Sequence, residues 1–316
     1  MTSVLALRAL GLGDTYAAVP ALRALRRGVD GARLVLAGPE SWGGLLVEQG
    51  VVDAVLPAAG LAALDWDLGP PDLAVNLHGS GPESHQLLQR LRPGRLVAFS
   101  CAAAGFTDGP QWDAEEHEVA RWIRLARELG GTATADDLRL PPPSGAPPHP
   151  GAVVVHPGAA FGSRRWPVER WSEVVAELLR AGLPVVVTGT ADEVGLTSAV
   201  AAAGPGAVDL GGELTPRALA QLVGAARLLL SADTGVAHLA TAYRTPSVTL
   251  FGPTPPAQWG PAVDRELHET VWLAQPGDLP GTPHGSEVDV RLARITPSDV
   301  LRPARRLLDL PVPQHS

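Results

Sequence analysis

Lysine is absent from this chain, cysteine occurs once, at Cys101, and aromatic residues make up only 4% of the sequence. A single cysteine excludes an internal disulfide and a cysteine-ligated metal cluster. Cys101 precedes a run of alanines, which is typical of a buried and unreactive thiol. No apolar run approaches the roughly 18 residues that a membrane-spanning helix requires. The composition therefore indicates a protein with mostly aliphatic cores and without a membrane span.

The formal charge of the chain is −8, and neither half is basic. Residues 1–150 contain 12 Arg and 17 acidic residues, and residues 151–316 contain 13 Arg and 16 acidic residues. This balance excludes nucleic-acid binding through a basic face. Because all 25 basic residues are Arg, any site that requires a cation must use a guanidinium. The first residues lead into an apolar segment without a charged leader or cleavage site, so we expect a cytoplasmic protein.

Short apolar runs alternate with amphipathic stretches along most of the chain, which predicts βαβ units and parallel sheets. The expected strands are 4–7, 34–37, 54–56, 73–77, 96–99, 153–156, 184–188, 207–210, 228–231 and 247–250. The expected helices are 15–27, 42–49, 83–91, 114–129, 167–181, 192–203, 216–224, 236–243 and 297–308.

A proline-rich segment divides this alternation into two halves. Residues 140–151 are half proline and cannot form a helix or a central strand, so they predict a stiff interdomain linker. We expect an α/β protein with two Rossmann-like domains, 1–145 and 146–296, followed by a C-terminal helix and tail, 297–316, that packs back. Substrates are then expected in a cleft between the two halves.

The stretch Ser231–Pro261 brings several polar residues to the ends of expected strands. Thr234 and His238 are four residues apart and share one face near the start of a helix. Unpaired N–H groups and the positive end of the helix dipole favour a phosphate or carboxylate there. A second strand, 247–250, ends beside the same place. Ligands of open α/β sheets bind in such positions, although His238 is also consistent with an ordinary core histidine.

Asp233 directly precedes that helix. We interpret it as an N-cap that accepts hydrogen bonds from the first turn and faces away from a bound phosphate, a role whose loss costs about 1 kcal/mol. If the carboxylate instead points into the site, it is assigned to hydroxyl groups of a donor sugar or a ribose.

Two loops of the first half follow expected strands. Gly11, Gly13 and Asp14 form a G-x-G-D turn that lacks the third glycine of the dinucleotide fingerprint, since Tyr16 stands there. Glycine lets the backbone approach a ligand closely, and Asp14 is either an N-cap or a functional carboxylate. His78 and Ser80 lie in the second loop.

Two loops of the second half suit a nucleotide. Residues 156–167 combine small residues, Ser163 and Arg164 with a helix start, so backbone N–H groups and a guanidinium could hold a diphosphate. Glu193 follows the turn 187–192 and is either a ligand group or an acid that complements the helix dipole. By contrast, Asp65-Trp66-Asp67 lies in a turn and not after a strand, and we attribute its D-x-D spacing to chance.

Together these motifs resemble glycosyltransferase family 9, the ADP-heptose:lipopolysaccharide heptosyltransferases. That family carries D-T/S-G-x-x-H-L-A and, after a strand, F-G-P-T-x-P-x-x-W-x-P. The chain matches these patterns at Asp233-Thr234-Gly235, His238-Leu239-Ala240, Phe251-Gly252-Pro253-Thr254, Pro256, Trp259 and Pro261. The G-x-G-D turn and an H-P-G loop followed by S-K-R-W-P are also shared, with Arg164 in place of the family's lysine.

The resemblance implies a GT-B fold and an inverting, metal-independent transferase. Such an enzyme moves a heptose-like sugar from a nucleotide-diphosphate donor, ADP-heptose, to a saccharide or glycolipid acceptor. Asp14 would be the base. The donor would contact Ser163, Arg164, Glu193, Asp233, Thr234, Gly235 and His238, and the acceptor would contact Gly13, His78 and Ser80. No cofactor, metal or nucleic acid is expected, and membrane contact would come only through the acceptor. A nucleotide-sugar epimerase or hydrolase and a non-catalytic nucleotide-sugar binding protein are the alternatives.

Overall fold

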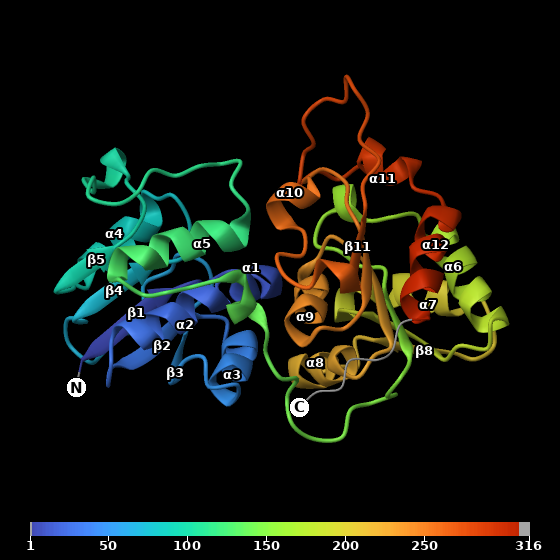
Figure 1. The fold of residues 1–316 in the computed structure, drawn as a ribbon, viewed down its shortest axis with the longest axis horizontal. Coiled ribbons are helices and arrows are strands. Elements are labelled where there is room, and N and C mark those ends of the chain that lie inside the picture. Colours follow the sequence, from blue (N-terminus) through green and yellow to red (C-terminus); the bar gives the residue numbers. More distant parts are fainter. Residues whose placement is uncertain (1, 310–316) are drawn as a thin grey trace. The chain divides into compact units, whose positions relative to one another are not determined.

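A computed structural model describes residues 2–309 of the chain, which divide into two compact units, Met1–Leu138 and Arg139–Ser316 (Figure 1). Each unit contains a parallel β-sheet with helices along its faces. The predicted α/β class is therefore confirmed. Among the described residues, no helix is both long and apolar enough to cross a membrane.

The first unit contains a five-stranded parallel sheet in the order β3-β2-β1-β4-β5. Its strands are β1 (Ser3–Leu7), β2 (Arg33–Gly38), β3 (Ala54–Pro57), β4 (Leu73–Asn76) and β5 (Arg95–Val97). The central strand β1 is apolar along its length because helices cover both faces of a parallel sheet. Its carboxyl end leads into the G-x-G-D turn.

The helices of the first unit are α1 (Leu12–Ala17), α2 (Val19–Gly28), α3 (Glu40–Glu48), α4 (Glu83–Arg90) and α5 (Glu118–Ala126), with short 3₁₀ turns at Ala102–Ala104, Arg127–Leu129 and Ala135–Leu138. The single helix expected over 15–27 is interrupted at Ala18. Pro20 explains the interruption, since it has no N–H to donate to the preceding turn and can occupy only the first turn of a new helix.

Helix α5 begins at Glu118, four residues later than predicted. His117 is its N-cap, and the Nδ1 atom of His117 accepts a hydrogen bond from the N–H of Val119 at 3.2 Å. The backbone carbonyls of Asp113 and Glu116, which precede it, accept hydrogen bonds from the side chain of Arg121 instead of from helical N–H groups. The side-chain cap at His117 thus sets where the helix starts, and the residues before it stay outside the helix although their amphipathic pattern continues.

The second unit contains a six-stranded parallel sheet in the order β11-β10-β9-β6-β7-β8. Its strands are β6 (Val153–His156), β7 (Val185–Gly189), β8 (Ala207–Gly211), β9 (Leu228–Ala232), β10 (Ser247–Leu250) and β11 (His268–Val271). The sequence does not predict β11, because three of its four residues, HETV, are polar. The strand forms by pairing with β10 at the edge of the sheet.

The helices of the second unit are α6 (Val168–Arg180), α7 (Val194–Ala201), α8 (Pro216–Gly224), α9 (Gly235–Tyr243), α10 (Pro256–Trp259), α11 (Val290–Arg294) and α12 (Pro297–Leu308), with 3₁₀ turns at Gly162–Arg164, Ala191–Glu193 and Arg265–Leu267. Helix α12 packs back on α6 and on strands β9 to β11 (Figure 1). Thr296 and Asp299 close its first turn as a capping box. The predicted tail beyond it, 310–316, lies outside the described residues.

The proline-rich linker belongs to the second unit, so the boundary falls at Leu138–Arg139 instead of at 145–146. Leu140 donates its N–H to the carbonyl of Ala242 at 2.9 Å, and Ser144 accepts hydrogen bonds from the side chains of Arg217 and Gln221. These bonds tie the linker to α8 and α9. Contacts that local sequence cannot reveal therefore decide where one unit ends.

Candidate functional site

Asp14 is the third residue of α1, and its carboxylate is bound by the guanidinium of Arg8. The Nη2 atom of Arg8 donates to Oδ1 of Asp14 at 2.9 Å, and its Nε atom donates to the backbone carbonyl of Asp14 at 2.9 Å. The N-cap of α1 is Gly11 and has no side-chain cap, so the N-cap interpretation of Asp14 is wrong. The Asp14 side chain is 31% exposed, whereas that of Arg8 is 1% exposed. The partly exposed carboxylate of Asp14 is thus held by a buried guanidinium. Gly13 is the second residue of the same helix.

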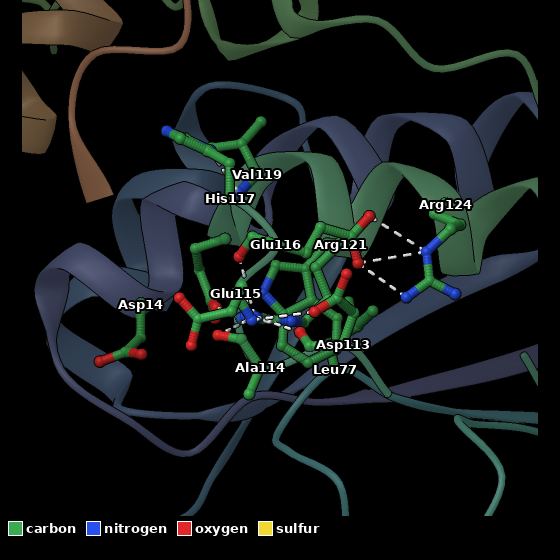
Figure 2. Close-up of polar contacts among 12 residues, drawn as sticks. Asp14, Leu77, Asp113, Ala114, Glu115, Glu116, His117, Val119, Arg121 and Arg124 are labelled. Carbon is green, nitrogen blue, oxygen red and sulfur yellow. Dashed lines mark hydrogen bonds and ion pairs between the residues drawn. The ribbon is translucent and has the colours of Figure 1, made fainter. Parts of the chain in front are cut away.

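Behind Arg8 lies a second carboxylate, that of Glu118 at the start of α5. The Nη2 atom of Arg8 also donates to Oε1 of Glu118 at 2.8 Å, and the guanidinium lies over the ring of Trp122 at 4.7 Å. Glu118 in turn accepts from Nε1 of Trp122 and from Arg121. Figure 2 shows Asp14 on one side of the surrounding polar residues and Arg124, which pairs with Glu116, on the other.

His78 follows β4 and stands next to the Asp14 turn. Its Nδ1 atom accepts a hydrogen bond from the N–H of Ala9 at 3.3 Å, and its own N–H donates to Oδ1 of Asn76. Burial, and then the charge of Arg8, lower the pKa of His78 to about 4. The ring is therefore neutral near pH 7 and carries its proton on Nε2. Ser80, the other predicted acceptor residue in this loop, is exposed.

In the second unit, the loop after β6 is joined to the segment 283–289. Ser163 donates its N–H to the carbonyl of Gly285 at 3.0 Å and its hydroxyl to that of Pro283 at 3.1 Å. The Nε atom of Arg164 also donates to Pro283, at 3.3 Å. Ser163 is 2% exposed, so its side chain holds the loop in shape, and Arg164 is the more accessible member of the predicted pair.

Arg164 and Asp233 are brought together, with Nη1 of Arg164 3.9 Å from Oδ2 of Asp233. Burial raises the pKa of Asp233 to about 6, and the charge of Arg164 opposes this shift. The N-cap of α9 is Thr234, without a side-chain cap, and the carboxylate of Asp233 is directed to Arg164. Our interpretation of Asp233 as an N-cap is therefore wrong, because the helix starts one residue later than that role requires.

The first turn of α9 begins at Gly235, with its neighbours Thr234 and His238 half-buried. The ring of His238 meets that of Trp259 edge to face at 5.8 Å. The two family-pattern residues His238 and Trp259 thus form a contact between α9 and α10, although strand β10 lies between these helices in the sequence.

Glu193 is buried and closes the turn before α7. Its Oε2 atom accepts from the N–H and the hydroxyl of Thr190 at 2.9 and 3.0 Å, which makes a capping box. Its carboxylate also lies against Gly158, where an added Cβ would come within 2.3 Å. Glu193 therefore does complement the first turn of a helix, as one of its two predicted roles required, and its carboxylate also faces the H-P-G loop.

His156 begins the same H-P-G loop. Burial lowers the pKa of His156, whose Nδ1 atom lies 2.9 Å from the hydroxyl of Thr188.

Sequence reasoning missed Arg8 and Glu118. Arg8 directly follows the buried strand β1, six residues before Asp14, and this position is visible in the sequence. Glu118, 110 residues away from Arg8, has no such signal. Among residues 2–309, no three His, Cys, Asp or Glu side chains are grouped so that they could hold a metal ion.

Two Rossmann-like parallel-sheet units of this kind define the GT-B class of glycosyltransferase folds. The chain is similar to the structure of the Escherichia coli ADP-heptose lipopolysaccharide heptosyltransferase II, with a TM-score of 0.76, 98% coverage of both chains and 21% identity. It also shares its fold with the iron-containing dodecameric glycosyltransferase TibC of enterotoxigenic E. coli, with a TM-score of 0.63, coverage of 97% of this chain and 76% of that one, and 15% identity.

The model of glycosyltransferase family 9 (heptosyltransferase) matches residues 110–276, and the chain belongs to this family. Lipopolysaccharide heptosyltransferase 3 of E. coli is 26% identical over 193 residues, which are 60% of this chain and 52% of that protein. The chain thus spans about half the length of this curated relative. The matched region contains the loops of Arg164, Glu193 and Asp233.

Proposed function

We propose that the protein is an inverting glycosyltransferase that moves a heptose-like sugar from a nucleotide diphosphate, ADP-heptose, to a saccharide or glycolipid acceptor of the lipopolysaccharide core. The observation that carries this proposal is the juxtaposition of Arg164 and Asp233 beside the first turn of α9 in a family 9 chain. The names of the relatives, which are lipopolysaccharide heptosyltransferases, support the choice of sugar and acceptor.

On the acceptor side, Asp14 is the base. Its carboxylate takes the proton of the acceptor hydroxyl as that oxygen forms a bond to the anomeric carbon. Arg8 holds both the carboxylate and the backbone of Asp14, so the base has one orientation. The neutral ring of His78, which carries its proton on Nε2, is suited to donate a hydrogen bond to an acceptor oxygen.

On the donor side, the bond between the anomeric carbon and the diphosphate breaks, and its electron pair remains on the phosphate oxygen. The guanidinium of Arg164 and the free N–H groups at the start of α9, near Thr234 and Gly235, would stabilise that growing charge. His238 lies on the first turn of the same helix and is a further donor. These groups supply positive charge where other transferases use a metal ion, so we propose that no metal is required.

We propose that Asp233 contacts hydroxyl groups of the donor sugar or ribose and not the phosphates. A carboxylate beside a diphosphate would repel it, whereas hydroxyl groups donate readily to a carboxylate. Arg164 lies within 3.9 Å and can offset the charge of Asp233. Glu193 is proposed to contact the ribose through its second oxygen, since Thr190 already binds Oε2.

The proposal is tested by following the release of ADP from ADP-heptose with and without a heptose-accepting lipopolysaccharide core. Release that depends on the acceptor, together with gain of one heptose by the acceptor in mass spectrometry, is the expected result. Release without acceptor would identify a hydrolase, and a rearranged nucleotide sugar would identify an epimerase. Donor binding, seen as raised thermal stability, without any reaction would identify a binding protein. UDP-sugars serve as the control for the nucleotide.

A further inference from the structure

A single nitrogen of Arg8 joins two carboxylates that come from distant parts of the first unit. Nη2 donates to Oδ1 of Asp14 at 2.9 Å and to Oε1 of Glu118 at 2.8 Å. The remaining bonds of Arg8 go to backbone carbonyls, from Nε to Asp14 and from Nη1 to Leu77 at 2.6 Å. The guanidinium therefore cannot follow Asp14 without breaking its bonds to Glu118 and Leu77.

The surroundings of Arg8 make these charges strongly interdependent. The side chains of Arg8 and Glu118 are 1% and 6% exposed, and Trp122 covers the guanidinium. Charges that are removed from water interact more strongly than charges at the surface. Arg121 forms a further ion pair with Glu118, so the two guanidiniums and two carboxylates balance while Asp14 is ionised.

A carboxylate that is bound to a guanidinium holds a proton less readily, which conflicts with the task of a base. Glu118 offsets part of the positive charge of Arg8 from the opposite side. We propose that Glu118 is a positioning residue, which shares Arg8 with Asp14 and so keeps Asp14 both oriented and basic enough to take the proton of the acceptor. This inference rests on the proposed function, and it adds a residue that contacts neither substrate.

Other charged groups lie on the elements that surround α1. His78, after β4, is neutral at assay pH, with a pKa of about 4. On α2, which contacts α1, Arg26 pairs with Asp53 and Arg27 pairs with Asp137. The other charged residues on the helices that contact α1, besides Glu118, are Arg23, Glu40, Glu48, Arg121 and Arg124. Arg8 binds both Asp14 and Glu118, so a change at Glu118 acts on Asp14 through Arg8.

The test compares Glu118→Gln with the matched control Glu116→Gln. Glu116 lies two residues earlier and pairs with Arg124, away from Asp14. In Glu118→Gln, the whole charge of Arg8 acts on Asp14, so the acidic limb of the kcat/KM profile is expected to move to lower pH by about one unit. We expect kcat at the plateau to fall and KM for the donor to stay unchanged, whereas Glu116→Gln moves neither.

A second readout does not depend on transfer. The carboxyl carbon of Asp14, labelled with ¹³C and assigned with Asp14→Asn, is expected to titrate at lower pH in Glu118→Gln than in the wild type. An unchanged titration would overturn the inference even if the variant were slow or less stable. If Glu118→Gln does not fold, Glu118→Asp moves the charge away from Arg8 by one methylene and is expected to give a smaller shift in the same direction.

The two readouts separate failure of this inference from failure of the proposed function. If the wild type transfers no sugar from any donor while the titration of Asp14 shifts, the function is wrong and the linkage between Glu118 and Asp14 stands. The opposite case is a wild type that transfers heptose and an Asp14→Asn variant that does not. If Glu118→Gln then leaves both the acidic limb of the kcat/KM profile and the titration of Asp14 unchanged, the function stands and Glu118 is only structural.

Discussion

Arg8 of the first unit and Arg164 of the second are held in opposite ways. In the first, Arg8 is fully buried and makes hydrogen bonds of 2.6–2.9 Å to Asp14, Glu118 and Leu77. In the second, Arg164 is one-quarter exposed, makes one hydrogen bond of 3.3 Å and lies 3.9 Å from Asp233. Under the proposed function, the first arrangement would hold the base before the acceptor arrives, and the second would let a guanidinium turn toward the donor. The difference is the one expected for the separate tasks of proton abstraction and leaving-group stabilisation.

The comparison is tested most strongly at Asp14. We expect Asp14→Asn to lower kcat by about 100-fold or more, the usual contribution of a general base, while thermal stability and donor binding remain nearly the same. Turnover is measured by ADP release, and donor binding by calorimetry. Transfer at the wild-type rate would show that the Arg8–Asp14 pair serves the fold alone.

Arg164 provides the corresponding test in the second unit. Arg164→Ala is expected to weaken ADP binding about tenfold, which corresponds to a charge-assisted hydrogen bond of about 1.4 kcal/mol, and to leave adenosine binding unchanged. Calorimetry with both ligands measures the difference. Arg180→Ala is the control, because Arg180 lies at the C-terminal end of α6 and pairs with Glu177. An equal loss for adenosine and ADP would contradict a role in phosphate binding.

Asp233 is expected to show a smaller effect, which depends on pH. Its pKa in the folded protein is about 6, above the usual value of 3.8. Between pH 4 and pH 6 the folded state therefore keeps a proton that the unfolded state has lost, and stability falls as pH rises through this window. We expect Asp233→Asn to raise the melting temperature at pH 8 by a few degrees and to have little effect at pH 4. An equal change in melting temperature at pH 4 and pH 8 would show that the charge of Asp233 does not destabilise the folded state.

Removal of metal ions is expected to have the smallest effect. If guanidiniums and the start of α9 stabilise the leaving diphosphate, then EDTA followed by gel filtration should leave kcat unchanged within error. Restored activity on addition of Mg²⁺, Mn²⁺ or Fe²⁺ would contradict this prediction. Arg164→Ala is measured in parallel, because a metal requirement that appears only in this variant would show that Arg164 replaces the ion.

Most of the fold follows from local sequence. The predicted strands 153–156 and 247–250 match β6 and β10 residue for residue. Three consecutive valines give β6 the apolar signal of a central parallel strand that is buried on both faces. Helices are less well predicted where a proline or a cap competes with the amphipathic pattern, as at Pro20 and His117. The edge strand β11 is missed because three of its four residues, His268, Glu269 and Thr270, are polar and no apolar run marks it.

The sequence by itself determined the alternation of strands and helices, the family, and the loops that follow the strands, since these depend on residues that are near one another in the chain. Only the tertiary structure decided that Glu118 meets Arg8 across 110 residues and that Asp233 is directed to Arg164 instead of capping α9. Local pattern predicts where a residue stands on the backbone. The direction of its side chain and the state of its charge depend on burial and on partners that folding brings from elsewhere.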